Sequence, residues 1–238
     1  MDQKLAVLFM PDDMTLTKEK TPLMLRPILF CPILTWMVEE LMGQGVERFF
    51  IVSDVRAHDI MRPYIPEQAD VTYVDGVKHG EELLKLLKGE KGSVLIVNGA
   101  VLPVGVFSGG AVYSAEAAEC CKVLKEHGAF AAFPKGAEIT KGFLPVGDDE
   151  EIRSAQDMCR RKIADKHFAA GVSIMDANNT YIDPRVTIGS GTVILPGTIL
   201  RGRTVIGKNC TIGPNTMIRD CVIGDETEVN ASQLNESR

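Results

Sequence analysis

The chain has 238 residues, a formal net charge of −6 and six cysteines. This length allows one or two domains with a buried core, and the acidic balance gives no basic stripe, so nucleic acid is not expected as a partner. The cysteines lack Cys-x-x-Cys spacing, which favours a reducing compartment over a disulfide framework or a zinc site. No apolar run is long enough for a signal peptide or a membrane span, so we expect a soluble cytoplasmic protein with no membrane partner.

Apolar strands and amphipathic helices alternate over the first part of the chain. We predict a helix that starts with Ser114 as its N-cap and ends at Gly128. This alternation predicts an α/β domain with a parallel sheet covered by helices. The other predicted strands are residues 4–9, 48–53, 71–75, 93–97 and 129–133, and the other predicted helices are residues 32–43 and 77–87.

A further segment, residues 149–169, has helical propensity and contains neither glycine nor proline. We therefore expect a linker helix between two domains. The predicted organisation is an α/β domain at 1–148, a linker helix at 149–171 and a repeat domain at 172–238.

Aliphatic residues recur at a strict interval of six in the C-terminal part. A period of six indicates a parallel β-helix, and three hexads per coil are typical of the left-handed form. The hexads from Ile182 to Val229 give fewer than three coils, about 13 Å at about 4.8 Å per coil, with only residues 233–238 left to cover the open end. The repeated residues are Ile182, Ile188, Ile194, Leu200, Ile206, Ile212 and Ile218, each followed four positions later by Val186, Thr192, Thr198, Thr204, Cys210, Thr216 or Val222.

The hexad frame slips once near its end. Ile218 is followed by Ile223 after five residues, so we expect a bulge in the last coil. Ile206 should then lie between Ile188 and either Gly224 or its neighbour Ile223, because one coil is about 18 residues.

Residues 144–215 carry motifs of a known family. The helix sequence Arg-Arg-Lys-Ile at 160–163, Ala-Gly-Val-x-Ile-x-Asp at 170–176 and Thr-Tyr-Ile-Asp at 180–183 resemble the linker helix and first β-helix coils of the bifunctional N-acetylglucosamine-1-phosphate uridyltransferase and glucosamine-1-phosphate acetyltransferase. The order of elements in residues 4–97 resembles that family's nucleotidyltransferase domain. The resemblance implies a shortened Rossmann-like nucleotidyltransferase-type domain followed by a short left-handed β-helix. It also implies a transferase relative that makes UDP-N-acetylglucosamine, a cell-wall precursor.

The nucleotide-binding loop of the resembled family is degenerate here. That loop contains two glycines, which let the backbone approach phosphates, and an arginine that meets their charge. The corresponding residues are Leu8, Phe9, Met10, Pro11, Asp12 and Asp13, with two carboxylates where a polyphosphate would lie.

The catalytic and metal positions that the resemblance implies are also substituted. Leu23 stands where the family has its catalytic lysine, and Phe30-Cys31 replaces a Gly-Lys pair. Ala100 and Gly147 stand at the two metal-ligand positions, although nucleotidyl transfer needs a divalent cation on the triphosphate. We interpret the neighbouring Asp148 and Asp149 as helix N-terminal carboxylates rather than replacement ligands. No cofactor is therefore expected, and Mg²⁺ only if the site has been rebuilt.

Histidine gives no catalytic or metal pattern. The four histidines, at 58, 79, 127 and 167, have no ligand spacing, and none follows His167. Acetyl transfer on a β-helix needs a general base, usually histidine, so acetyltransferase activity is not expected. The sequence around His79, Lys78-His79-Gly80-Glu81, is interpreted as the start of a helix.

Three hypotheses follow for function. The first is a relative of the UDP-N-acetylglucosamine pyrophosphorylases without either transferase activity, which acts as an interaction or regulatory protein. The second is an active sugar-1-phosphate nucleotidyltransferase with a non-standard site. The third is a fragment of a longer bifunctional enzyme. We expect a homotrimer with a possible protein partner.

Overall fold

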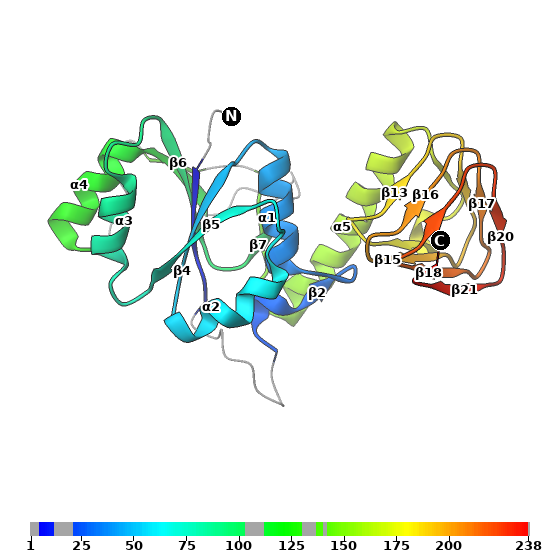
Figure 1. Cartoon of the computed structure of the whole chain (residues 1–238), viewed down its shortest axis with the longest axis horizontal. Coiled ribbons are helices and arrows are strands. Elements are labelled where there is room, and N and C mark those ends of the chain that lie inside the picture. Colours follow the sequence, from blue (N-terminus) through cyan, green and yellow to red (C-terminus); the bar gives the residue numbers. More distant parts are fainter. Residues whose placement is uncertain (1–4, 12–20, 103–111, 130–136, 140–141, 238) are drawn as a thin grey trace. The chain divides into compact units, whose positions relative to one another are not determined.

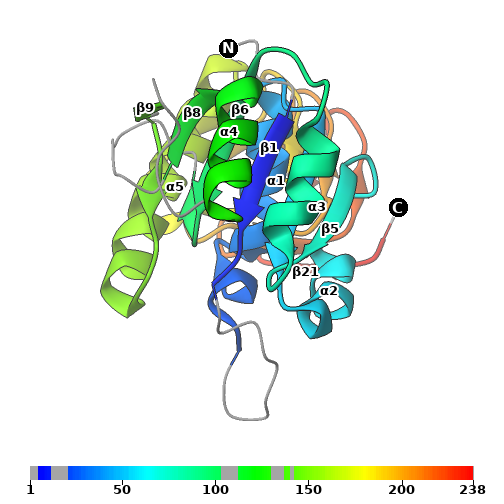
Figure 2. The same ribbon diagram turned by 90° about the vertical axis from the view of Figure 1, so that its left-hand side faces the viewer.

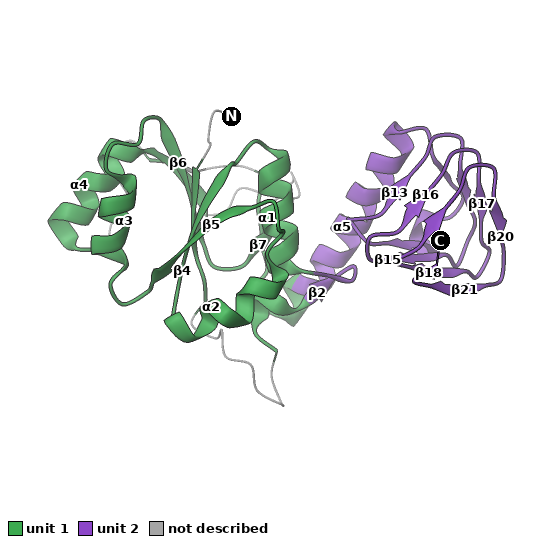
Figure 3. Cartoon of the chain, viewed as in Figure 1, with its two compact units in different colours: residues 1–26, 32–151 green, residues 27–31, 152–238 purple. Residues whose placement is uncertain are grey.

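The computed structural model describes residues 5–11, 21–102, 112–129, 137–139 and 142–237, and the chain divides into two compact units (Figures 1 and 3). The first unit comprises residues 1–26 and 32–151, and the second comprises residues 27–31 and 152–238. The boundary therefore lies near the start of helix α5 (Asp149–Ala169), the segment for which the sequence predicts a linker helix. Most of α5 groups with the β-helix because Ile163 and Ala164 lie beside Ile174 and Ile182 of its first coil.

A six-stranded sheet forms the centre of the first unit, in the order β5-β4-β1-β6-β8-β9. The first four strands are parallel, whereas β8 is antiparallel to β6 and β9 is antiparallel to β8. The predicted parallel sheet is thus confirmed for its four strands, and the two antiparallel strands β8 and β9 were not predicted. The strands are β1 (Leu5–Phe9), β4 (Arg48–Ser53), β5 (Asp70–Asp75), β6 (Ser93–Asn98), β8 (Val112–Glu116) and β9 (Glu138–Ile139).

Helices cover both faces of this sheet. Figure 2 shows α3 and α4 on one face and α1 on the other. The first unit also has two short 3₁₀ helices and a two-stranded ladder that pairs β7 with β10. These elements are α1 (Ile33–Gly43), α2 (Val55–Met61), α3 (His79–Leu87), α4 (Ala117–His127), η1 (Leu23–Leu25), η2 (Arg62–Tyr64), β7 (Val101–Leu102) and β10 (Leu144–Pro145).

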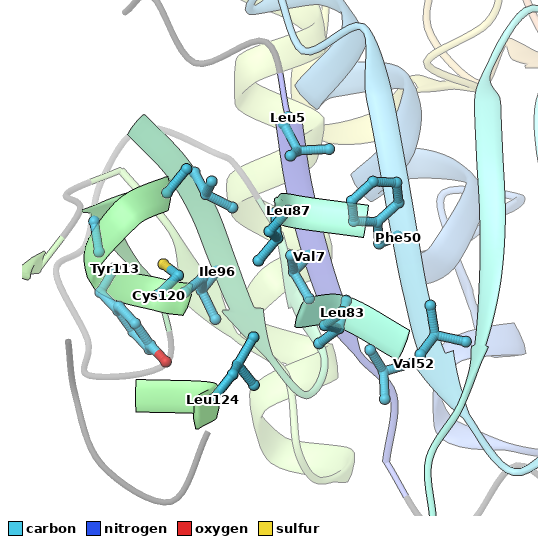
Figure 4. Close-up of a cluster of buried hydrophobic side chains, with 14 residues drawn as sticks. Leu5, Val7, Phe50, Val52, Leu83, Leu87, Ile96, Tyr113, Cys120 and Leu124 are labelled. Atoms are coloured by element: carbon cyan, nitrogen blue, oxygen red, sulfur yellow. The ribbon is translucent and has the colours of Figure 1, made fainter. Parts of the chain in front are cut away.

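The core beneath α3 and α4 follows from strand alternation. Side chains at every second position of a strand point to one face, so Leu5 and Val7 meet Leu83 and Leu87 of α3 (Figure 4). Cys120 lies in the same cluster, and burial raises the pKa of its thiol to about 12. This thiol therefore packs as a small apolar group.

The predicted start of the fourth helix is wrong. Ser114 lies in strand β8, opposite Leu95, and α4 begins at Ala117 without a side-chain cap. Pairing with β6 takes up the backbone of this segment, so tertiary structure overrides the capping preference of serine. The end of the helix is predicted correctly, because Gly128 has φ 68° at the C-cap. All but Ala129 of the predicted strand at 129–133 lies outside the described residues.

The second unit is a three-faced parallel β-helix. Its eleven strands form sheets of four, four and three strands, with every neighbouring pair parallel. One face contains β11 (Ser173–Ile174), β14 (Val193–Ile194), β17 (Thr211–Ile212) and β20 (Glu228–Val229). The second contains β12 (Tyr181–Ile182), β15 (Ile199–Arg201), β18 (Met217–Arg219) and β21 (Gln233–Asn235). The third contains β13 (Thr187–Ile188), β16 (Val205–Ile206) and β19 (Val222–Ile223).

The β-helix is longer than the predicted stub of fewer than three coils. It begins at Ser173 and continues to Asn235, so the segment expected to cover the open end instead forms β21 on top of β18. The strict hexad count missed both ends because the 3₁₀ turn η3 (Ala177–Asn179) interrupts the first coil and later coils lose residues.

The predicted inward positions are confirmed. All seven aliphatic residues of the hexads are at most 8% exposed, and the small residues four positions later are buried with the exception of Val222. Val222 is 48% exposed, and the neighbouring Cys221 takes the inward place with 0% exposure. Cys221 replaces Val222 as the inward residue because the spacing from Ile218 to Ile223 is five residues instead of six.

The coils shorten toward the C-terminus. Ile206 pairs with Ile188, eighteen residues earlier, and with Ile223, seventeen residues later, so the predicted slip is confirmed. Met217 pairs with Gln233, only sixteen residues later.

One residue at each corner of the later coils has a positive φ. Glycine suits this conformation best, and asparagine or aspartate is the next best choice. The stacked corners change from glycine to Asn or Asp and then to Glu or Ala along the β-helix. The three columns are Gly191, Asn209 and Glu226; Gly197, Asn215 and Ala231; and Gly202, Asp220 and Glu236.

The buried side chain of Asp183 forms hydrogen bonds with two successive coils. Its carboxylate is fully buried and accepts hydrogen bonds from Nε and Nη2 of Arg185, at 2.9 and 2.7 Å. It also accepts bonds from the backbone N–H groups of Arg185 and Gly202, each at 3.1 Å. Gly202 lies one coil further on, so this single carboxylate bonds to two successive coils.

His167 is a buried ionisable group in α5. It is 4% exposed, and burial, with a smaller contribution from Lys166, lowers the pKa of its imidazole to about 4. The unfolded chain should bind a proton near pH 6.5, so between pH 6.5 and 4 the unfolded state takes up more protons than the folded state.

We therefore expect stability to fall as the pH drops through this window, by about 3 kcal/mol at pH 4 from this group alone. His167→Phe should remove much of that pH dependence, whereas His127→Phe, at an exposed position, should keep it. Thermal unfolding of the three proteins between pH 7 and 4 measures the difference. Parallel stability profiles for all three would contradict a neutral, buried His167.

No helix among the described residues combines the length and apolar character needed to cross a membrane.

Candidate functional site

A pocket lies at the carboxyl ends of three parallel strands in the first unit. Its volume is about 490 Å³, within the usual range of small-molecule sites. The carboxyl edge of an open parallel sheet is the place where α/β proteins commonly bind ligands. The lining residues are Phe9, Met10 and Pro11 at the end of β1, Val52, Ser53, Asp54 and Arg56 at the end of β4, and Gly76, Val77 and His79 after β5.

Backbone hydrogen bonds hold these strand ends together. The N–H of Met10 donates to the carbonyl of Val52 at 2.9 Å, and the N–H of Gly76 donates to the carbonyl of Ser53 at 2.8 Å. A Cβ atom on Gly76 would lie 3.2 Å from the Ser53 backbone, so this approach is closest with glycine. The floor of the pocket is therefore set by main-chain contacts.

The charged groups of the pocket neutralise each other. Arg56 binds Asp54 in a bidentate manner, with Nε–Oδ1 at 3.0 Å and Nη2–Oδ2 at 2.7 Å. The side-chain bond from Arg56 and a second bond from its backbone N–H lower the pKa of Asp54 to about 2. Because Arg56 is engaged in this pair, the pocket has little net positive charge for a polyphosphate.

His79 closes the β5 side of the pocket. Its Nδ1 lies 2.6 Å from the carbonyl oxygen of Gly76, and its ring meets the edge of Phe9 with centroids 5.6 Å apart. The predicted helix start is confirmed, since α3 begins at His79. The position near a ligand-sized space was not predicted, because the pocket joins segments that are distant in sequence.

The degenerate loop is described only in part. Leu8 and Phe9 end strand β1, and Met10 and Pro11 continue to the pocket rim. Asp12 and Asp13 lie outside the described residues.

The structure brings the two implied metal positions together. Strands β7 and β10 pair antiparallel, and the N–H of Val146 donates to the carbonyl of Ala100 at 2.9 Å, which places Gly147 beside Ala100. Ala100 is 8% exposed, and neither residue has a side-chain oxygen. The backbone geometry that would join two ligands is present, but these two positions cannot coordinate Mg²⁺ through their side chains.

The carboxylates beside Gly147 are engaged in other contacts. Asp148 Oδ1 accepts hydrogen bonds from the N–H groups of Glu150 and Glu151, at 2.9 and 2.8 Å. These contacts agree with the predicted capping role at the start of α5. Asp149 forms an ion pair with Arg26.

Leu23 lies in the 3₁₀ helix η1 and is partly exposed, whereas Met24 and Leu25 behind it are buried. An aliphatic side chain here cannot contact a phosphate by charge. Within the part of the chain that the structure describes, no group of three or more His, Cys, Asp or Glu side chains is arranged to hold a metal ion.

Sequence reasoning missed Ser53, Asp54 and Arg56. The available signal was their position: Ser53 ends a buried strand, and Asp54 and Arg56 come directly after it, where side chains of a parallel sheet reach its carboxyl edge. The pattern Asp-Val-Arg at 54–56 also begins the short helix α2, which Asp54 caps.

The chain combines two architectures in a fixed order. A Rossmann-like parallel sheet with two antiparallel strands is followed by a helix and a hexapeptide-repeat β-helix. No protein-family model matches the chain.

Curated proteins that match the chain are named "Bifunctional protein GlmU". The protein of Geobacillus sp. strain WCH70 is 40% identical over 116 residues, which are 49% of this chain and 25% of that protein. The protein of Clostridioides difficile strain 630 is 36% identical over 120 residues, 50% of this chain and 26% of that protein. The protein of Caldanaerobacter subterraneus is 48% identical over 93 residues, 35% of this chain and 20% of that protein.

The chain is a relative of the bifunctional GlmU proteins, as its motifs indicated. The match spans about a quarter of the length of the first of these relatives.

Proposed function

We propose that this protein is a GlmU-related protein without uridyltransferase or acetyltransferase activity, which acts as an oligomeric interaction or regulatory protein. The observation that carries the proposal is the pairing of Ala100 with the segment at Gly147. At the two positions where the resembled family has metal ligands, this chain has Ala100 and Gly147, which offer no side-chain oxygen, and the pairing of β7 with β10 supports this interpretation. Removing a metal from phosphoryl-type transfer removes the main stabilisation of developing negative charge.

Two further losses point the same way. Leu23 supplies no cation where the resembled family has a lysine, and Arg56 is neutralised by Asp54 in the pocket. A transferring site needs several positive groups around a triphosphate, and the described residues of this pocket offer no free one. Acetyl transfer lacks a candidate base in the β-helix, since no histidine follows His167.

The alternative is an active nucleotidyltransferase with a non-standard site. The pocket at the strand ends favours this alternative, because its volume of about 490 Å³ suits a nucleoside. His79 would then contact the ligand from the α3 side. A regulatory protein could also bind a nucleoside without transferring a nucleotidyl group. The pocket alone therefore does not distinguish the regulatory function from the enzymatic one, whereas an assay of nucleotidyl transfer does.

We predict no formation of UDP-N-acetylglucosamine from UTP and N-acetylglucosamine 1-phosphate. Ala100 and Gly147 provide no ligands for the magnesium triphosphate, so the chemical step lacks its electrostatic stabilisation. Pyrophosphate release with and without Mg²⁺ measures the activity, with the bifunctional GlmU protein of Clostridioides difficile as the assay control.

Magnesium-dependent release well above the blank, lost on heating, would establish the active alternative. In that case His79→Ala should lower the rate and His127→Ala, at an exposed position, should not. This matched pair ties any activity to the pocket rather than to a contaminating enzyme.

The second element of the proposal is a homotrimer. Val205 and Val222 lie one above the other on the third face of the β-helix and are 42% and 48% exposed. Flat faces with exposed aliphatic side chains are suited to burial between subunits. Three chains of 26.0 kDa would give a particle of about 78 kDa.

Light scattering at micromolar concentration should report this trimer mass. Val205→Lys combined with Val222→Lys should shift the particle toward the monomer, whereas Thr187→Lys at the outer end of the same face should shift it less. A monomeric wild-type protein would contradict the oligomeric part of the proposal.

A further inference from the structure

A second pocket lies in the second unit, on the face formed by β12 and β15. Its volume is about 620 Å³, enough for a small organic molecule. The turn of residues 27–31 groups with this unit (Figure 3), and three of its residues line the pocket. The lining residues are Pro27, Leu29 and Phe30 of that turn, Gln156 of α5, and Tyr181, Ile199 and Arg201 of the β-helix.

Arg201 is the charged group of this pocket. Its Nε atom is buried and has no hydrogen-bond partner, and among the described residues no carboxylate pairs with its guanidinium. One coil later, Arg219 occupies the equivalent position and forms an ion pair with Glu236 at 3.2 Å. Arg201 therefore keeps a charge that its stacked neighbour neutralises within the chain.

The turn that faces Arg201 has a strained backbone. β2 (Pro27–Ile28) and β3 (Cys31–Pro32) are joined by Leu29 and Phe30, which have φ values of 46° and 70°. Two-residue turns of this kind favour glycine or asparagine, so leucine and phenylalanine hold the backbone here in a strained conformation. The resembled family has glycine at the position of Phe30.

The strained turn places an aromatic ring against the arginine. The guanidinium carbon of Arg201 lies 4.6 Å from the ring centroid of Phe30. A cation over an aromatic face is attracted to it, but the ring supplies no acceptor for the guanidinium N–H groups. The planar fork of Arg201 is thus oriented by Phe30 while its hydrogen-bonding capacity stays open.

Apart from the amide of Gln156, the other lining side chains of the cavity are apolar or aromatic. Ile199 lies beside Tyr181 in the ladder of β12 and β15, and the outer side of the Tyr181 ring meets Arg160 at 5.7 Å. Arg160 is itself paired with Asp157. The pocket consequently combines an apolar, aromatic body with a single open cation.

We propose that this pocket binds a small organic anion, with an aromatic or branched apolar body and one carboxylate. A carboxylate fits the fork of Arg201 in a bidentate manner, and a half-buried guanidinium whose Nε has no partner is stabilised by such a ligand. The apolar body would lie among Phe30, Tyr181 and Ile199. A single arginine matches a single negative charge better than a polyphosphate. The site is independent of nucleotide chemistry in the first unit.

Phenylacetate serves as the probe, with phenylacetamide as its neutral analogue and phenyl phosphate as the analogue with another anionic group. Titration of full-length protein, labelled with ¹³C at isoleucine methyl groups, is followed by NMR. We expect phenylacetate to shift the Ile199 methyl signal and not that of Ile51, in the sheet of the first unit. Phenylacetamide should bind about tenfold or more weakly.

Variants separate binding from folding. Arg201→Gln should weaken phenylacetate binding about tenfold or more, whereas Arg203→Gln, an exposed arginine on the same coil, should leave it within about twofold. Phe30→Gly relieves the backbone strain and removes one wall, so it should weaken binding without lowering the melting temperature.

Four results would overturn the proposal: no shift of Ile199 with millimolar phenylacetate, equal binding of phenylacetamide, equal loss in both arginine variants, or unchanged binding by Phe30→Gly. Tighter binding of phenyl phosphate than of phenylacetate would overturn the carboxylate assignment. None of these outcomes depends on transferase activity, so failure here is distinguishable from failure of the proposed function.

Discussion

Asp183→Ala is expected to lower the free energy of unfolding by about 3–5 kcal/mol, the range for breaking a buried ion pair from one side. The substitution removes the carboxylate that binds the Arg185 guanidinium and the acceptor for the backbone N–H of Gly202 in the next coil. The loss of a fully buried charged acceptor from two coils at once costs more than the loss of an exposed contact. Chemical denaturation of full-length protein measures the change.

Asp225→Ala is the matched control for this result. Asp225 also accepts a bond from the backbone of the preceding coil, at Lys208 N–H, but it is exposed to solvent. Water can replace it, so we expect a loss of about 1 kcal/mol. Equal losses for the two aspartates would show that burial of Asp183 adds nothing to its bonds.

Leu200→Ala and Ile206→Ala are each expected to cost about 2–5 kcal/mol. Both side chains are at most 2% exposed and stack between equivalents in the coils above and below. A backbone fixed by parallel ladders on three faces has little freedom to collapse around a cavity. Loss of the proposed trimer should accompany the loss of stability, as light scattering would detect.

Lys208→Ala provides the control within the same coil. The residue is exposed, so a change below about 0.5 kcal/mol in the free energy of unfolding is expected. The melting temperatures of the three variants test whether Leu200 and Ile206 point into the core and Lys208 points outward. A melting temperature as low for Lys208→Ala as for Ile206→Ala would be incompatible with the inward frame.

The β-helix was the most predictable part of the fold, because its pattern is local and repeated. Seven aliphatic residues in one frame determine which side chains point inward, and Ile206 lies between Ile188 and Ile223 as expected. The same method failed at the ends of the repeat. The turn at residues 177–179 and the shortened last coils break the period, although the backbone continues to pair.

The α/β unit was less predictable, because its decisive contacts join distant segments. Four parallel strands follow from apolar runs, but β8 pairs antiparallel with β6, and this pairing converts the expected cap Ser114 into a strand residue. Helix α2 was missed because seven residues with only Ala57 and Met61 buried give almost no periodic signal.

The sequence identified the residues at the family's site positions, but it did not predict which of them lie close together in space. Motif resemblance identified Leu23, Ala100 and Gly147, but the proximity of Ala100 and Gly147 depends on the ladder between β7 and β10. The pocket depends on three strand ends meeting at one edge. Sequence spacing alone predicts neither the proximity of Ala100 and Gly147 nor the convergence of the three strand ends.

The decreasing length of the coils limits how this β-helix could have grown by internal duplication. A copied segment preserves the ladders only if its length equals the offset between the strands at the point of insertion. Eighteen residues satisfy this condition between Thr187 and Val205, but the offset is sixteen between Met217 and Gln233. New coils could therefore be added in register in the regular part, while the same eighteen-residue duplication near β21 would shift the pairing by two residues. Such an even shift keeps the inward face of the strands, but it moves strand residues into the corners.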